Sequence, residues 1–125
     1  MALAHHIAAC NRHDPAAYWR LWIGDEPLGR VRPAFARRLA DFAGTFEVAD
    51  AGIRLNPRLA TTAARTAALG EVVSRLADAG DVSGLRGEMY PVARAWGAPP
   101  LAILDRGVVP SFGTVAWGVH VNGYV

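Results

Sequence analysis

Apolar residues recur every three or four positions in three stretches of the chain, which is typical of helices that bury one face. The predicted helices cover residues 2–12, residues 33–44 and the stretch from Asn56-Pro57 to Gly80. Proline suits the first position of the second helix, because no N–H is needed there. Gly44 and Gly80 are expected to end the second and third helices, since glycine readily adopts the C-cap conformation.

Shorter stretches are rich in β-branched and aromatic residues or alternate between apolar and polar positions, as strands do. They are residues 18–23 and 27–31, residues 45–49 and 52–55, residues 101–104, and Thr114 to Val125. The first two pairs each flank a short turn and predict hairpins, and residues 106–112 predict a turn or short helix. The expected fold class is therefore α+β, with two small hairpins, two to three helices and a C-terminal strand.

The chain has 125 residues, enough for one domain with a core that folds alone. Its hydrophobic content of 52% against 19% charged residues indicates a globular protein. All 13 basic residues are arginine, which we interpret as the mark of a GC-rich bacterial genome. A net charge of +2 and the lack of a long basic run predict no nucleic-acid partner. No stretch approaches the ~20 apolar residues of a membrane span, so we expect a cytoplasmic protein with no membrane partner.

Familiar catalytic and metal-binding patterns are absent from the sequence. His5 and His6 are adjacent, and on a helix they would point about 100° apart, so they are poorly placed to share a metal. The single cysteine, Cys10, excludes an intramolecular disulfide and is expected to be a small buried residue. There is neither a Gly-x-Ser-x-Gly elbow nor a Gly-rich phosphate loop. We therefore assign no catalytic and no metal-binding residue.

A series of short motifs runs through most of the chain. They are Leu28-Gly29-Arg30-Val31-Arg32-Pro33, Phe46-Glu47-Val48, Leu55-Asn56-Pro57, Gly87-Glu88-Met89-Tyr90-Pro91-Val92, Gly97-Ala98-Pro99-Pro100-Leu101, Asp105-Arg106, Phe112-Gly113 and Gly118-Val119-His120-Val121-Asn122-Gly123-Tyr124-Val125. In this order they resemble the N-terminal leader region, of unknown function, of a Nudix hydrolase branch related to the Nudix part of fungal thiamine pyrophosphokinase fusion proteins. The resemblance implies an accessory α+β domain over residues 1–113. It also implies that residues 114–125 are the first strand of a truncated Nudix domain.

The same resemblance implies a parent enzyme that cleaves a diphosphate with Mg²⁺. Such an enzyme holds the metal with a cluster of carboxylates on one helix. The acidic residues of this chain are scattered, and Glu71 and Asp78 stand alone on their predicted helix. The Nudix box is therefore absent, and we expect this chain alone to be inactive. Its expected partners are a C-terminal Nudix domain in the parent, a second copy of itself, and a small diphosphate ligand.

Polar residues alternate along two of the predicted strands and form the candidate ligand surface. Arg86, Glu88 and Tyr90 would share one strand face, and His120 and Asn122 another. Arg86 suits an anionic group, because its planar fork matches phosphate oxygens. Tyr90 would supply a ring or hydroxyl contact, and His120 and Asn122 would orient the ligand by hydrogen bonds. A solvated surface or structural hydrogen bonding explains the same alternation.

Two tryptophans in the first hairpin have two interpretations. Trp19 and Trp22 are three positions apart in a predicted strand and so face opposite sides. Both can be core residues only if the strand bulges or both faces are covered. The alternative is a ring that stacks on a ligand.

Three functions remain open on the sequence alone. The first is a non-catalytic N-terminal region of a Nudix-type diphosphate hydrolase, which shapes the substrate pocket or the dimer interface. The second is a stand-alone binding or interaction module that pairs through its C-terminal edge strand. The third is a small complete enzyme, for which no site can be named.

Overall fold

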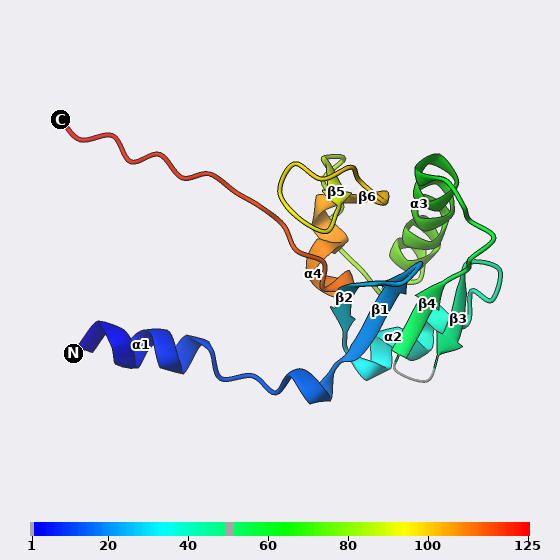
Figure 1. The fold of residues 1–125 in the computed structure, drawn as a ribbon, viewed down its shortest axis with the longest axis horizontal. Coiled ribbons are helices and arrows are strands. Elements are labelled where there is room, and N and C mark those ends of the chain that lie inside the picture. The colour runs from blue at the N-terminus through cyan, green and yellow to red at the C-terminus, as the bar shows by residue number, and fades with distance from the viewer. Residues whose placement is uncertain (1, 50–51) are drawn as a thin grey trace.

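The computed structural model describes residues 2–49 and 52–125. The fold class is α+β, as predicted, with a four-stranded sheet, a two-stranded sheet and the helices that pack on them (Figure 1). The elements are α1 (Ala2–Cys10), a 3-10 turn (Pro15–Ala17), β1 (Trp19–Ile23), β2 (Glu26–Val31), α2 (Pro33–Ala40), β3 (Phe46–Ala49), β4 (Gly52–Leu55), α3 (Thr62–Asp78), β5 (Met89–Val92), β6 (Ala102–Asp105), a second 3-10 turn (Arg106–Val108) and α4 (Val109–Phe112).

The four-stranded sheet is built from the two predicted hairpins. β1 pairs antiparallel with β2, and β3 pairs antiparallel with β4. The hairpins join through a parallel pairing of β1 with β4, in which Leu21 lies opposite Ile53, so the strand order is β2-β1-β4-β3. Parallel strands need a crossover connection, and the one between β1 and β4 includes α2. Alternation predicted each hairpin but not the pairing between them.

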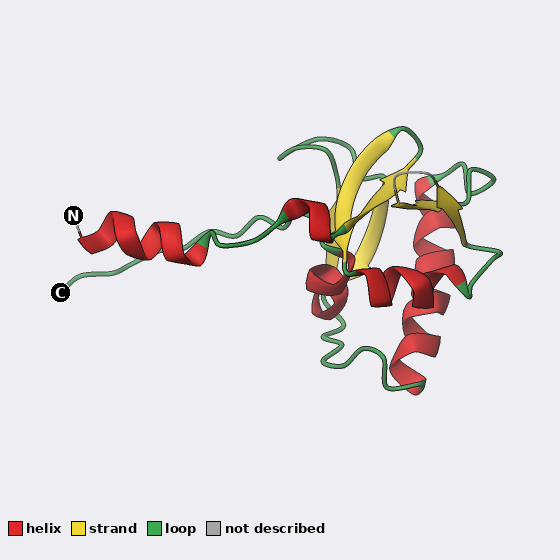
Figure 2. Ribbon diagram, turned by 90° about the horizontal axis from the view of Figure 1, so that it is seen from below, coloured by secondary structure: helices red, strands yellow, loops and turns green. Residues whose placement is uncertain are grey.

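One hydrophobic core joins the inner face of the large sheet to the helices that lie beside it (Figure 2). Its largest fully buried side chains are Phe46, Phe112, Leu39, Ile53, Leu76, Val31, Val92 and Val108. Each such side chain contributes roughly 1.5–3 kcal/mol through burial. The ring of Phe112 packs edge-on against that of Phe35, with 5.4 Å between the centroids, so α4 is held against α2. This core occupies one face of β1 and β2, and their other face carries polar side chains.

Two helices have different ends from those predicted. α3 begins at Thr62, not at Asn56-Pro57, and its N-cap is Thr61, whose side chain accepts a hydrogen bond from an amide in the first turn. Asn56 forms a local turn instead: its Oδ1 accepts from the amide two residues later, and its Nδ2 donates to the carbonyl of Gly44. Such local side-chain bonds compete with helix formation. α2 ends at Ala40, earlier than predicted.

Three side chains of α3 fasten the two-stranded sheet of β5 and β6 to this helix. The hydroxyl of Thr62 donates to the carbonyl of Pro100 at 2.9 Å, and that of Thr66 accepts from the amide of Ile103 at 3.0 Å. Between them, Arg65 donates to three backbone carbonyls, two in the loop before α3 and one just before β6. The small sheet is thereby joined to the rest of the body.

Both ends of the chain leave this body (Figure 1). Cys10 in α1 is exposed rather than buried as predicted, because α1 packs on no other element among the residues that the structure describes. Residues 114–125 form no strand in this structure: the segment is extended but, in the described part of the chain, has no sheet partner, so its place as the first strand of a Nudix sheet stays a prediction. A strand is stable only when neighbouring strands satisfy its backbone groups. One aromatic contact anchors the segment, with 6.2 Å between the ring centroids of Trp117 and Trp96.

Candidate functional site

Three of the five predicted site residues lie together, but not as one strand face. β5 begins at Met89, so Arg86 and Glu88 precede the strand and Tyr90 lies within it. The carboxylate of Glu88 forms an ion pair with Arg106 at 2.7 Å, and this carboxylate raises the pKa of Arg106. The same guanidinium lies 5.9 Å from the centroid of the Tyr90 ring. Glu88 and Tyr90 therefore both contact Arg106.

Arg86 is held through its backbone. The amides of Arg86, Gly87 and Gly107 donate to the carboxylate of Asp105 at 3.0, 2.8 and 2.7 Å. These hydrogen bonds, that of Arg86 foremost, lower the pKa of Asp105. The arrangement ties the segment before β5 to the end of β6, which is a structural role. A ligand contact by the Arg86 side chain stays a prediction.

His120 and Asn122 lie on the extended C-terminal segment, where both are exposed. This segment follows a separate path away from the body (Figure 1). The structure therefore does not bring them to Arg86, Glu88 and Tyr90. Their alternation would define a common face only within a sheet, and their contact with a ligand also stays a prediction.

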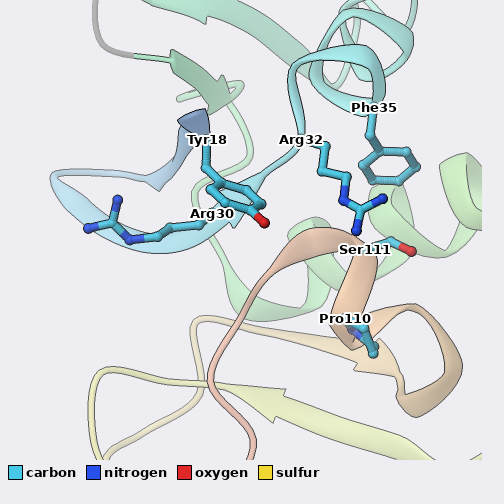
Figure 3. Close-up of a pocket in the computed structure, with 6 residues that line it drawn as sticks. All are labelled: Tyr18, Arg30, Arg32, Phe35, Pro110 and Ser111. Atoms are coloured by element: carbon cyan, nitrogen blue, oxygen red, sulfur yellow. The ribbon is translucent and has the colours of Figure 1, made fainter. Parts of the chain in front are cut away.

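A different group of basic side chains meets on the outer face of the large sheet. Arg20 in β1 lies directly opposite Arg30 in β2. Val31, the next residue in β2, is fully buried, so Arg30 lies on the outer side, whereas Arg32 follows the end of β2 and its side chain points toward Phe35 and Ser111 (Figure 3). Within residues 2–49 and 52–125, every ion pair between side chains involves other arginines. Arg20 and Arg30 thus form an outer arginine face, on which like charges lie side by side at an energetic cost.

A pocket of about 390 Å³ opens at this face (Figure 3). It is lined by Tyr18, Arg30, Arg32, Phe35, Pro110 and Ser111. Tyr18 lies just before β1, Arg30 in β2, Arg32 between β2 and α2, and the other lining residues in α2 and α4. Figure 3 shows the guanidinium of Arg32 between the ring of Phe35 and the side chain of Ser111. The lining combines the guanidinium of Arg32 with two hydroxyls and no carboxylate, whereas the guanidinium of Arg30 is directed away from that of Arg32 and donates to the carbonyl of Pro15 (Figure 3). A second hollow, of about 330 Å³, shares Arg30 and adds Arg20.

Close backbone contacts hold the pocket together. The amide of Arg30 donates to the carbonyl of Gly113 at 3.2 Å, and the Arg30 side chain donates to the carbonyl of Pro15 at 3.3 Å. Gly113 caps α4 in the left-handed conformation, with φ of 62°. A Cβ at Gly113 would collide with the backbone of Arg30, and one at Gly29 with the carbonyl of Phe112. β2 and the end of α4 can therefore approach so closely only because both positions are glycine.

Trp22 extends the outer arginine face across the sheet. The Cζ atoms of Arg20 and Arg54 lie 6.0 and 5.9 Å from the centroid of its ring. Trp19 is half-buried against the core, and a bulge separates Leu21 from Trp22. Trp19 lies on the core side and Trp22 beside Arg20 on the other side, so the two tryptophans face opposite sides of the strand, as predicted, and the bulge does not bring both into the core. Cation–π contacts, each worth about 0.5–1 kcal/mol at an exposed site, occupy the Trp22 ring.

The described residues do not fit a metal ion or a membrane span. Among them, no three His, Cys, Asp or Glu side chains are placed to hold a metal together. The carboxylates needed for Mg²⁺ are therefore not gathered in this part of the chain. No helix in the same residues is long and apolar enough to cross a membrane.

The pocket was not predicted from the sequence, because four separate segments form it. One signal was available: Arg30 and Arg32 alternate at the end of a hairpin whose other strand carries Arg20. Tyr18 and Ser111 stand in no recognisable motif, and only the packing of α4 against β2 brings Ser111 to the pocket.

Comparisons with known proteins identify the family. Residues 2–116 match the model of a domain of unknown function, DUF4743. The chain is 33% identical over 105 residues to "Nudix hydrolase 24, chloroplastic" of Arabidopsis thaliana, which covers 82% of this chain and 29% of that protein. It is also 33% identical over 130 residues to "Nudix hydrolase 20, chloroplastic" of the same plant, which covers 95% of this chain and 35% of that protein.

The chain thus spans about a third of the length of these relatives, in their N-terminal regions. Both are plant proteins with chloroplastic names, so they support neither the bacterial origin nor the cytoplasmic location predicted from the sequence. The chain belongs to the DUF4743 family, a domain associated with Nudix hydrolases.

Proposed function

We propose that this domain is the non-catalytic N-terminal region of a Nudix-type diphosphate hydrolase and forms part of the wall of its substrate pocket. Membership of a Nudix-associated family supports the class of parent enzyme. The described residues lack a carboxylate cluster, which fits a division in which the hydrolytic chemistry belongs to another part of the parent. In such a parent, Mg²⁺ would be held by that other part and would supply the charge that activates the diphosphate.

The position of the pocket is the observation that carries this proposal. Arg30 lines the pocket, and its amide is bonded to Gly113, the last residue before the extended segment. By the resemblance, that segment contains the first Nudix strand, so a Nudix domain would follow directly from the pocket rim. Pocket-forming side chains of this domain would then lie next to the catalytic region. The finer relation to fungal thiamine pyrophosphokinase fusion proteins belongs to the same proposal and makes thiamine diphosphate a substrate to test.

An exchange of domains tests this role. The matching segment of Nudix hydrolase 24 is replaced by this chain, and kcat/KM is measured with Mg²⁺ for thiamine diphosphate, nucleoside diphosphate sugars and dinucleotides. We expect the order of preference to change, with at least one ratio of kcat/KM shifting about tenfold, equivalent to about 1.4 kcal/mol. An unchanged order in a chimera with a normal Tm would contradict the proposal.

The isolated chain supplies a second test. It should hydrolyse none of these diphosphates, because no cluster of carboxylates in the described residues can hold Mg²⁺. Turnover above about 0.1 s⁻¹ that survives repurification would show that the chain is itself an enzyme, since typical enzymes turn over at about 1–1,000 s⁻¹.

An interaction module is the second candidate function. Val119 and Val121 on the extended segment are 82% and 89% exposed, although valine is usually buried. Such a segment favours pairing with a partner strand, either in the parent or in a second copy. A dimer interface formed in this way is compatible with a substrate pocket on the outer arginine face.

A further inference from the structure

The outer face of the large sheet is not packed by α2, α3 or α4. All three helices contribute side chains to the core, which lies on the inner face. On the outer face, Arg20 stands opposite Arg30, and Trp22 stands opposite Pro27 and beside Arg54. These five residues form what is termed here the docking face.

The side chains of the docking face are of the kind that concentrate in interfaces. Tryptophan and arginine are among the residue types most enriched where binding energy is concentrated. The Cζ atoms of Arg20 and Arg54 lie 6.0 and 5.9 Å from the centroid of the Trp22 ring, so the ring is held between two guanidinium groups. Such prior ordering lowers the entropy cost of binding. A sheet face that only meets water is usually polar, and a tryptophan on a central strand is unexpected there.

The charge of the docking face defines the chemistry of its partner. Arg20 and Arg30 are directly opposed, which destabilises a sheet. Arg30 donates to the carbonyl of Pro15, and its other N–H groups remain available to a second acceptor. Glu47 lies opposite Arg54 in the edge strand β3, but no carboxylate of the described residues forms an ion pair with any of the three arginines. Carboxylates placed over Arg20 and Arg30 by a partner would relieve the repulsion.

The chain itself passes this face as it leaves α4. A hollow of about 330 Å³ is lined by Arg20, Leu28 and Arg30 together with Gly113 and Val115, at the start of the extended segment. In both plant relatives the match to this chain covers only 29% and 35% of the protein, in the N-terminal region. In the parent of the proposed function, the next domain would therefore be tethered beside the docking face. A short tether gives a high effective concentration, so even a modest interface forms.

We propose that the docking face is the interdomain surface of the parent, on which the domain that follows residue 113 packs with carboxylates over Arg20 and Arg30 and apolar side chains over Trp22. This inference rests on the proposed function and deepens it by naming the surface and the chemistry of its partner. Arg30 also lines the pocket beside α4, so that pocket lies at the rim of the interface. Ligand sites occur preferentially between domains.

Chemical modification of arginine reports whether the docking face is covered. The chimera described above, in which this chain replaces the matching segment of Nudix hydrolase 24, is compared with this chain alone. Both react with an arginine-specific dicarbonyl, and peptide mass spectrometry gives the rate at each site. We expect Arg20 and Arg30 to react at least about fivefold more slowly in the chimera, because docking buries them. Arg58, in an exposed loop outside the docking face, should differ by less than about twofold.

Reversal of one charge separates docking from folding. Arg20→Glu removes the cross-strand repulsion with Arg30 and should maintain or raise the Tm of this chain alone. In the chimera the same change sets a carboxylate against those of the partner, so Arg30 should again react as fast as in the chain alone. Arg58→Glu makes the same charge change outside the docking face and should alter neither result. Arg20→Gln provides the milder comparison if the melting curve of Arg20→Glu shows a loss of folding.

Two outcomes would overturn the docking face. One is an equal modification rate of Arg30 in the chimera and in the chain alone. The other is a rate in the chain alone that falls as its concentration rises, which would show that a second copy covers the surface. The domain exchange reads kcat/KM and is independent of this labelling. An altered substrate preference without protection of Arg20 would refute only the docking face, and protection without an altered preference would refute only the role in the substrate pocket.

Discussion

The backbone amide of Arg86 donates a 3.0 Å hydrogen bond to the carboxylate of Asp105, which lies 19 residues further along the chain. Two more amides, those of Gly87 and Gly107, donate to the same carboxylate. All three donors favour its charged form, so the pKa of Asp105 is lowered. The carboxylate therefore connects the segment before β5 to the turn after β6 more strongly when it is ionised than when it is protonated.

This connection predicts a loss of stability in acid. A carboxyl with a lowered folded pKa stabilises the fold above its unfolded pKa, about 3.9 for Asp. That contribution disappears as the pH falls through the folded pKa. We expect Asp105→Asn to lower Tm at neutral pH and to flatten the fall of Tm below about pH 4. Circular dichroism melts across this range measure both, with the exposed-turn variant Asp25→Asn as the control. An equally steep acid fall in Asp105→Asn would contradict the assignment.

Arg65 is expected to contribute more to stability than any exposed ion pair. Arg65→Met keeps much of the aliphatic stem but leaves three carbonyls without their donor, and should cost about 1–3 kcal/mol of unfolding free energy. Arg75→Met removes only the exposed pair with Glu71 and should cost less than about 0.5 kcal/mol. Urea unfolding with a common m value compares the two. Similar losses would mean that the Arg65 hydrogen bonds have little energetic value.

Two glycine substitutions should have opposite effects. Gly70 lies inside α3 with open space where a Cβ would stand, so Gly70→Ala should stabilise the fold by up to about 1 kcal/mol. Gly107 lies against the backbone of Gly84, so Gly107→Ala should destabilise it by about 1–3 kcal/mol. Thermal melts of the two variants provide the comparison. A change of the same sign in both would be inconsistent with the packing described above.

Association through the extended segment predicts that a charge there weakens self-assembly. The chain should form dimers or larger species at about 100 µM, because a high protein concentration favours association. Val121→Lys should shift it toward monomer, since a lysine blocks edge pairing. Ser83→Lys adds the same charge at an exposed site in another part of the chain and should not. Light scattering measures the mass, and a monomeric wild-type chain would refute this interaction.

The sequence predicted the elements whose cause is local. Both hairpins followed from alternation around short turns. The start of α3 was misplaced, because Asn56 and Thr61 are both plausible caps and only the contact of Asn56 with Gly44 decides between them. The parallel pairing of β1 with β4 depends on packing between distant segments, which periodicity does not record.

Even less of the candidate site could be predicted from the sequence. Arg86 and Glu88 alternate as strand residues do, yet the hydrogen bonds of Asp105 hold the segment just before β5 outside the strand. The extended C-terminal segment has the composition of a strand, but composition supplies no neighbour to pair with. The pocket with Arg30 and Arg32 depends on α4 reaching β2 from almost eighty residues away, so only its arginine alternation was visible in advance.

Gly29 and Gly113 meet where β2 adjoins the end of α4, and a side chain at either would enter backbone next to the other. In evolutionary terms, these two positions are not free to change independently, because substitution of one alone would force apart the strand and the helix end. The two glycines together therefore fix the place at which the extended C-terminal segment leaves the body.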